Sequence, residues 1–186
     1  MDMNIEFALF GITLVLELLL GGGLIISLLL PKYRLWPPPK KDSWQYWFIH
    51  FSTESSIFCY LILGLLDWNT FFLTHWFRFI FAFILMFPGA AFFLWAFRTL
   101  SINTSLGLRG KLVTTGPYRC SRNPQYVGIV LFFSGTMLFF NSFYALIIGF
   151  IGNIWFLLTP FTEEPWLREQ FREEYDDYCK KVPRFI

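Results

Sequence analysis

Five long apolar blocks set the strongest limit on how this chain can fold. They cover residues 5–30, 44–66, 76–97, 126–140 and 143–160, and the interior of the first is interrupted by Glu17. A helix needs about 20 mainly apolar residues to cross the hydrocarbon core of a bilayer. Apolar residues make up 55% of the chain and its mean hydropathy is +0.50, which is unlike an ordinary soluble domain. The sequence therefore predicts an all-α, polytopic membrane protein with about five transmembrane helices.

The segments between the blocks predict how the helices are arranged. Only Asn141 and Ser142 separate the last two blocks, so these should form an antiparallel hairpin, although block 126–140 is short for a full crossing. Three consecutive prolines at 37–39 predict a rigid, extended linker at the membrane surface. Residues 98–123 are polar and basic, without the capacity to span a bilayer. We divide the chain into three N-terminal spans at 1–98 and a second region at 99–186.

The tail after residue 161 is strongly charged and carries a periodic apolar pattern. Its large apolar residues recur at steps of three and four, which predicts an amphipathic helix lying on protein or on lipid headgroups. These residues are Trp166, Leu167, Phe171, Tyr175 and Tyr178.

Basic residues indicate the orientation in the membrane. They cluster after the first block and again after the third, whereas the loop after the second carries Asp67 and His75. The positive-inside rule then places both basic segments and the tail in the cytosol. Five crossings put the N-terminus outside and the C-terminus in the cytosol. The basic residues are Lys32, Arg34, Lys40 and Lys41, then Arg98, Arg109, Lys111, Arg119 and Arg122.

The first candidate binding segment is the polar, Gly- and Pro-punctuated stretch 110–128, which leads directly into a buried helix. Asn123-Pro124 favours a helix start, because proline is tolerated in a first helical turn. The unpaired N–H groups of that turn form a natural receptor for a carboxylate, and Arg122 lies beside them. Tyr118 and Tyr126 add rings and hydroxyls. A juxtamembrane loop with anchoring arginines and tyrosines would show the same composition.

The second candidate is the acidic pair Glu163-Glu164 at the end of the fifth block. These carboxylates suit ribose hydroxyls or a cation, but they also suit the solvated start of the tail helix. Because the hairpin folds back, its two cytosolic ends should bring the acidic pair close to segment 110–128. A ligand with a carboxylate, a ribose and a cationic centre would find partners there. S-adenosyl-L-methionine has these groups, and nucleotide cofactors share some of them.

These motifs, in this order and spacing, resemble the superfamily of isoprenylcysteine carboxyl methyltransferases and phospholipid methyltransferases. The resemblance covers about residues 100–186. It rests on L-V-T-T-G-P-Y at 112–118, R-N-P-Q-Y-V-G at 122–128, E-E at 163–164, F-R-E-E-Y-D-D-Y at 171–178 and V-P-R-F at 182–185.

The resemblance implies a site for S-adenosyl-L-methionine within region 99–186, and no metal. Arg122, Tyr126 and Glu164 are the expected catalytic residues: Arg122 would bind an anion of cofactor or substrate, and the other two would fix the cofactor. The expected cofactor-binding residues are Asn103, Gly110, Lys111, Leu112, Val113, Tyr118, Asn123, Pro124, Gln125, Tyr126 and Glu163.

Two departures from the superfamily pattern bear on chemistry. Asn123 stands where histidine is usual, and an amide does not act as an acid or base near neutral pH. Thr159 lies one turn before Glu163, where prenylcysteine-specific members carry an arginine thought to engage the substrate carboxylate. That absence weakens a prenylcysteine assignment.

The function that the resemblance implies is methyl transfer to a lipidic or hydrophobic acceptor at the boundary between membrane and cytosol. The expected partners are this acceptor, a small molecule that would enter from the bilayer, and the membrane lipids, and we expect neither nucleic acid nor an obligatory protein partner. Two alternatives stay open: an NADPH-dependent sterol or lipid double-bond reductase of similar architecture, and a non-catalytic membrane protein.

Glu17 and Glu54 lie within predicted membrane helices, where a charged group costs about 2.5–3.5 kcal/mol. His50 precedes Glu54 by one turn, so the two could pair on one helix face. Either acid could line a substrate tunnel or form an interhelical hydrogen bond, and Glu54 could instead lie near the surface.

Overall fold

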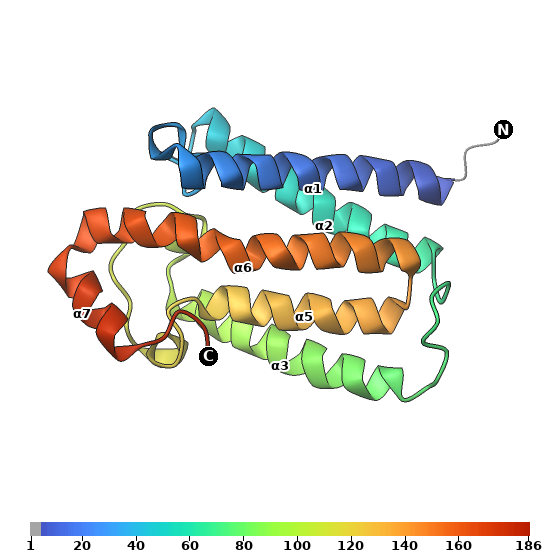
Figure 1. Cartoon of the computed structure of the whole chain (residues 1–186). Coiled ribbons are helices and arrows are strands. Elements are labelled where there is room, and N and C mark those ends of the chain that lie inside the picture. Colours follow the sequence, from blue (N-terminus) through green and yellow to red (C-terminus); the bar gives the residue numbers. More distant parts are fainter. Residues whose placement is uncertain (1–4) are drawn as a thin grey trace.

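The computed structural model describes residues 5–186, which form helices joined by loops. Five long helices run roughly side by side (Figure 1): α1 (Ile5–Leu29), α2 (Trp44–Leu66), α3 (Arg78–Thr99), α5 (Pro124–Phe140) and α6 (Phe143–Phe171). The short elements are η1 (Pro31–Tyr33), α4 (Ile102–Ser105), η2 (Gly116–Arg119) and α7 (Glu173–Lys181). The predicted all-α fold is confirmed.

Four of the long helices, α1, α2, α3 and α6, are long and apolar enough to cross a membrane, and α5 is a shorter apolar helix. Their polarity is the reverse of that in a soluble protein: apolar side chains face outward, and polar or small ones face the other helices. On α1 most of the inward residues are polar or small, whereas Leu18 and Leu19 point outward and are exposed. Exposed apolar side chains suit lipid as the surrounding solvent. The inward residues are Thr13, Glu17, Gly21, Gly23, Leu24 and Ser27.

Two glycines hold α3 and α5 at short range. A Cβ on Gly89 would lie 2.6 Å from the backbone nitrogen of Phe132, and a Cβ on Gly128 would lie 2.6 Å from that of Phe93. Any larger residue would therefore force the helices apart. Small residues at such crossings are how membrane helices bring their backbones together. This contact fixes the position of the first turn of α5.

The hairpin of α5 and α6 forms as predicted, and its turn is closely bonded. Asn141 adopts a left-handed conformation with φ of 48°, and the Ser142 hydroxyl accepts a hydrogen bond from the N–H of Ala145 at 2.9 Å. Asp67, at the end of α2, accepts bonds from the Ser142 hydroxyl at 2.5 Å and from the N–H of Tyr144 at 3.1 Å. The turn is thus anchored to α2.

The end of α6 differs from the expectation. The apolar block ends near residue 160, but the helix continues through Pro160 and Pro165 to Phe171. Arg172, with φ of 48°, then turns the chain into α7. The amphipathic tail is therefore two helical pieces, and the first is an extension of the last membrane helix. The acidic pair at 163–164 consequently lies inside a continuous helix.

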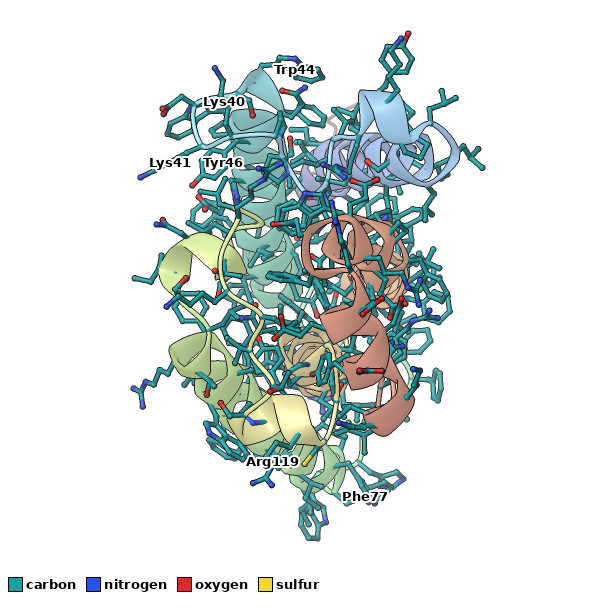
Figure 2. All side chains as sticks on the ribbon, turned by 90° about the vertical axis from the view of Figure 1, so that its left-hand side faces the viewer. Lys40, Lys41, Trp44, Tyr46, Phe77 and Arg119 are labelled. Carbon is teal, nitrogen blue, oxygen red and sulfur yellow. The ribbon has the colours of Figure 1, made fainter. Side chains whose placement is uncertain are left out.

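One end of the molecule gathers the linker after α1, the segment 100–123, α7 and the C-terminus (Figure 1). Figure 2 views this end, with Lys40, Lys41 and Arg119 at its periphery. The loop 67–77 and the hairpin turn lie at the opposite end (Figure 1). Both basic segments and the tail thus share one end, as the charge pattern indicates. The extreme N-terminus, expected outside, falls on residues 1–4 and so lies outside the described residues.

Candidate functional site

A cavity opens at the end of the molecule where the linkers gather. Its walls come from the segment that follows α3, from the first turn of α5, from the last turns of α6 and from α7. It holds about 90 Å³. The two candidate segments of the sequence therefore converge on one cavity, because the hairpin returns α6 beside the start of α5.

Glu163 lies at the centre of this arrangement. One of its carboxylate oxygens, Oε1, accepts a hydrogen bond from the indole Nε1 of Trp36 at 2.6 Å and a short one from the hydroxyl of Tyr126. Trp36 belongs to the linker after α1, so a single carboxylate joins three segments that are distant in the chain. Pro37 and Pro38 of that linker are buried rather than lying free at the membrane surface.

Glu164 has a different environment from its neighbour. Successive residues of a helix point in directions about 100° apart, so Glu164 turns away from the cavity wall and is only 3% exposed. It forms an ion pair with Arg122 at 3.0 Å. Arg184 binds both of its oxygens, each at 2.8 Å. Glu164 therefore joins α6 to the segment before α5 and to the C-terminus.

The C-terminal residues close over the segment that precedes α5. The carbonyl of Pro183 accepts a hydrogen bond from the N–H of Arg122 at 2.9 Å. The carbonyl of Arg184 accepts bonds from the Ser121 hydroxyl and from the Asn123 side-chain amide, each at 3.1 Å. Asn123, which stands where the superfamily usually has histidine, is thus engaged in holding the tail.

Three tyrosines supply aromatic walls that stay protonated. Burial raises the pKa of Tyr118, and the negative charge of Glu163 raises it further. Burial likewise raises the pKa of Tyr175 and of Tyr178. The hydroxyl of Tyr178 donates to the carbonyl of Tyr118 at 2.6 Å, which ties α7 to the turn η2. At neutral pH these groups offer neutral rings and hydroxyls, with no charge.

Most of the residues that the sequence singled out do line the cavity. Asn103, Pro124 and Glu164 do not: Asn103 is exposed on α4, Pro124 is buried at the start of α5, and Glu164 is held in its ion pairs. The ten that line it are Gly110, Lys111, Leu112, Val113, Tyr118, Arg122, Asn123, Gln125, Tyr126 and Glu163.

Other wall residues were missed by the sequence analysis. Thr104 and Ser105 lie next to Asn103, and the Gln125 amide donates to the Ser105 hydroxyl at 2.9 Å. The tail contributes its periodic apolar face, which had been assigned to protein or headgroups. The spacing of these residues predicts an apolar helix face, but it does not indicate which surface that face covers. The tail residues are Trp166, Leu167, Gln170, Phe171, Tyr175 and Tyr178.

A second, more apolar cavity of about 280 Å³ lies between the membrane helices. It shares Ser105, Gln125 and Tyr126 with the first cavity, so the two meet at the start of α5. Apolar side chains of α1, α2, α3, α5 and α6 form most of its wall. They include Leu20, Leu24, Ile49, Ile57, Phe93, Phe97, Ile129, Trp155 and Phe156.

The two intramembrane acids have different outcomes. Glu17 lines the second cavity, whereas Glu54 is exposed on α2 and is not part of either wall. The suggested pairing of His50 with Glu54 is wrong. The His50 ring instead lies against Trp36 and Tyr46, and its Nε2 is 3.4 Å from the carbonyl of Leu106. Glu54 is exposed on the surface of α2, whereas His50 is half-buried.

Comparison with known proteins agrees with the geometry. The model of the phospholipid methyltransferase family matches residues 77–174, from just before α3 into α7, which is more than half of the chain. The chain belongs to the phospholipid methyltransferase family. This family's matched region includes Tyr118, Arg122, Tyr126 and Glu163, and the predicted superfamily resemblance is confirmed.

A curated relative with the family's chemistry comes from Schizosaccharomyces pombe (strain 972 / ATCC 24843). It is a protein-S-isoprenylcysteine O-methyltransferase, 36% identical over 77 residues, which are 40% of this chain and 32% of the relative. The match thus spans about a third of the length of that relative. No solved structure gives a significant match. Together, the family and the apolar helices identify an integral membrane protein of a methyltransferase family.

Proposed function

We propose that this protein transfers a methyl group from S-adenosyl-L-methionine to a lipidic or hydrophobic acceptor at the membrane surface. We call the first cavity, at the end of the helix bundle, the polar cavity because Lys111, Arg122 and Glu163 line it, and the second, between the helices, the apolar cavity. One observation carries the proposal: the two cavities meet at Ser105, Gln125 and Tyr126. A polar donor and an apolar acceptor can therefore approach one another at the start of α5.

The walls of the polar cavity suit the chemical groups of this cofactor. Lys111 and Arg122 suit its carboxylate, and the Nε–H of Arg122 is buried without an acceptor among the described residues. Glu163 suits ribose hydroxyls or the cationic centre. The rings of Tyr118, Trp166 and Phe171 offer apolar faces to the base.

The cavity must widen to take the whole cofactor. Its volume of about 90 Å³ is below the roughly 300–1,000 Å³ typical of small-molecule sites. Segment 107–113 has no regular secondary structure, and Gly110 and Lys111 within it are exposed. We infer that this segment moves outward as the ligand enters.

The cofactor supplies an activated methyl group on a sulfonium, so positioning can do most of the catalytic work. The residues of the chain bind and orient the two reactants and exclude water from the site. Tyr126 is fixed by its hydrogen bond to Glu163, and Gln125 by its bond to Ser105, and both lie where the cavities meet. An acceptor thiolate or carboxylate needs no base there, and an amine needs only to lose its proton.

Membrane orientation follows from the charge distribution. Both basic segments lie at the end that carries the polar cavity, and the positive-inside rule assigns that end to the cytosol. A soluble cofactor would then enter from the cytosol and the acceptor from the bilayer. Thr159, in the wall of the apolar cavity, brings no positive charge to receive an acceptor carboxylate, which disfavours a prenylcysteine.

The reductase alternative is disfavoured by charge. NADPH carries several phosphates and needs several cations, whereas Lys111 and Arg122 are the basic residues among the described wall residues of the polar cavity. Two basic residues would therefore neutralise only part of the negative charge of a phosphate-rich ligand.

Calorimetric titration of the protein in lipid nanodiscs tests the proposal. S-adenosylhomocysteine should bind saturably and NADPH should not. Incubation with methyl-labelled cofactor and a membrane lipid extract should then label an organic-soluble product. Saturable NADPH binding would favour the reductase, and the absence of binding by either ligand would favour a non-catalytic protein.

A further inference from the structure

Glu17 is a carboxyl group in the middle of α1, and it forms part of the wall of the apolar cavity. It is only 6% exposed. The Ser56 hydroxyl of α2 donates to its Oε1 at 2.5 Å. Within residues 5–186 no basic side chain forms an ion pair with it. Neither Glu17 nor Ser56 lines the polar cavity, and the proposed transfer of the methyl group uses neither residue.

The carboxyl group keeps unused hydrogen-bonding capacity. A carboxylate can accept about four hydrogen bonds, and one serine supplies one of them. On the facing helix, α6, Gly152 lies against the carboxyl group: a Cβ there would be in van der Waals contact with the two oxygens of Glu17, at 3.7 Å and 3.8 Å. A charged group within a membrane helix costs about 2.5–3.5 kcal/mol, so a carboxyl group that borders a cavity with hydrogen-bonding capacity to spare points to a ligand.

The apolar cavity extends along one face of α6. Gly152, Phe156 and Thr159 line it, and Glu163 continues the same face into the polar cavity. Gly152 and Glu163 are separated by eleven positions in the chain, which is about 16 Å at a rise of about 1.5 Å per residue. Glu17 therefore lies at the opposite end of the cavity from the site of methyl transfer.

The end of the apolar cavity that holds Glu17 is polar, whereas the middle of the cavity is hydrocarbon. Leu20, Ile57, Ile129 and Phe156 offer hydrocarbon, which suits a chain or ring system without polar atoms. A purely hydrocarbon tail that reached Glu17 would leave the carboxyl group with the Ser56 hydroxyl as its hydrogen-bond donor and supply no second one. Such an unsatisfied buried group costs about 1–3 kcal/mol or more.

We infer, building on the proposed function, that the acceptor is a two-ended amphiphile. One end carries the group to be methylated and lies beside Gln125 and Tyr126. The apolar body fills the cavity along α6. The far end carries a hydrogen-bond donor, a hydroxyl or an amino group, which binds Glu17 beside Ser56. The acceptor therefore differs from a molecule whose tail is hydrocarbon to its tip.

Photolabelling in nanodiscs tests this inference. Three probes share a ten-carbon chain with a central diazirine, and they end in a hydroxyl, an amino or a methyl group. The hydroxyl and amino probes should label residues 17–24 and 152–159 at least about tenfold more than the methyl probe, as expected for a hydrogen bond to a carboxyl group. Equal labelling by the three probes would overturn the inference.

Variants show whether Glu17 causes the preference. Glu17→Leu should reduce labelling by the two polar probes to the level of the methyl probe. Glu54→Leu, which removes a lipid-exposed acid from α2, is the matched control and should retain the preference. Glu17→Gln covers the case in which the leucine variant does not fold: it should weaken labelling by the amino probe more than by the hydroxyl probe. An unchanged preference in Glu17→Gln and Glu17→Leu would contradict the inference.

Binding of S-adenosylhomocysteine separates this inference from the proposed function. Glu17→Leu should bind it as the unmodified protein does, because Glu17 is not in the wall of the polar cavity. If the unmodified protein fails to bind it but still prefers the polar probes, the methyltransferase proposal fails and the amphiphile site stands. Binding without a probe preference refutes the amphiphile site alone.

Discussion

At the scale of single residues, two adjacent glutamates have separate tasks. Glu163 faces the polar cavity and accepts hydrogen bonds from Trp36 and Tyr126. Glu164 points away from that cavity and is buried between Arg122 and Arg184. Their helical positions cause the separation, because successive side chains on a helix point about 100° apart, and here that angle directs Glu164 away from the cavity and towards the two arginines. The two acids should therefore respond differently to the same substitution.

Glu163→Gln should weaken cofactor binding and leave the fold intact. Glutamine keeps an oxygen that accepts the bonds from Trp36 and Tyr126, but it removes the negative charge. Losing a charge-assisted hydrogen bond costs about 1.5–3 kcal/mol, or roughly 10- to 100-fold in affinity. Titration with S-adenosylhomocysteine measures this loss. Glu169→Gln, an exposed change on the same helix, should bind normally, and equal affinity in both variants would contradict the assigned role.

Glu164→Gln should instead destabilise the protein. The substitution leaves the guanidinium groups of Arg122 and Arg184 without their charged partner, and breaking a buried ion pair costs about 3–5 kcal/mol. Thermal unfolding in detergent should show a clear fall in the midpoint. Asp177→Asn removes the exposed pair with Lys180 and should leave the midpoint unchanged, because surface pairs contribute little. A midpoint equal to that of the unmodified protein would show that the buried pair is dispensable.

At the scale of helices, the position of the polar site depends on how α5 is held. Its first turn carries Gln125 and Tyr126, and its contact with α3 requires Gly89 and Gly128. On the other side, α6 packs against α5 and carries Glu163. The approach of α3 therefore sets where the walls of the two cavities meet.

Gly128→Ala should destabilise the bundle. The added Cβ would lie 2.6 Å from the backbone nitrogen of Phe93 and 2.8 Å from the carbonyl oxygen of Gly89, and backbone has little freedom to move away. Overpacking of this kind costs about 1–3 kcal/mol, which unfolding by SDS titration can detect. Gly22→Ala is the control, because a Cβ there meets no atom within 4 Å. Equal stability of the two variants would show that the α3–α5 contact is looser than described.

At the scale of the whole molecule, one end differs in charge and chemistry from the other. The linker after α1, the segment 100–123 and the C-terminal tail lie together at the end that holds the polar cavity (Figure 1). The opposite end holds the loop 67–77 and the hairpin turn. We propose that the first end faces the cytosol, and cysteine labelling can test this assignment.

Cys120 provides the label, since it is exposed at the proposed cytosolic end. With Cys59 and Cys179 replaced by alanine, a membrane-impermeant maleimide should react with Cys120 only after cells are permeabilised. Adding Phe72→Cys, at the opposite end where Phe72 is 72% exposed, should create a site that reacts in intact cells. Reaction of Cys120 in intact cells would show that this end faces outward and would contradict the proposed orientation.

Much of the fold and part of the site are readable from the sequence. Apolar block lengths predict the membrane helices, and the two-residue connection at 141–142 predicts the hairpin. Asn123-Pro124 predicts the start of α5, and the motifs identify half of the residues that line the polar cavity. These features depend on local composition and on spacing within one segment, which the order of residues specifies directly.

Only the tertiary structure decides which side chains meet across segments. Trp36 binds Glu163 from a position 127 residues away in the chain, Glu164 turns from the expected site into an ion pair, and Glu17 enters a cavity while Glu54 faces lipid. The physical reason is helix rotation. In an apolar environment nearly every face of a membrane helix is hydrophobic, so periodicity does not define an inward side, and the packing of glycines and polar groups sets it.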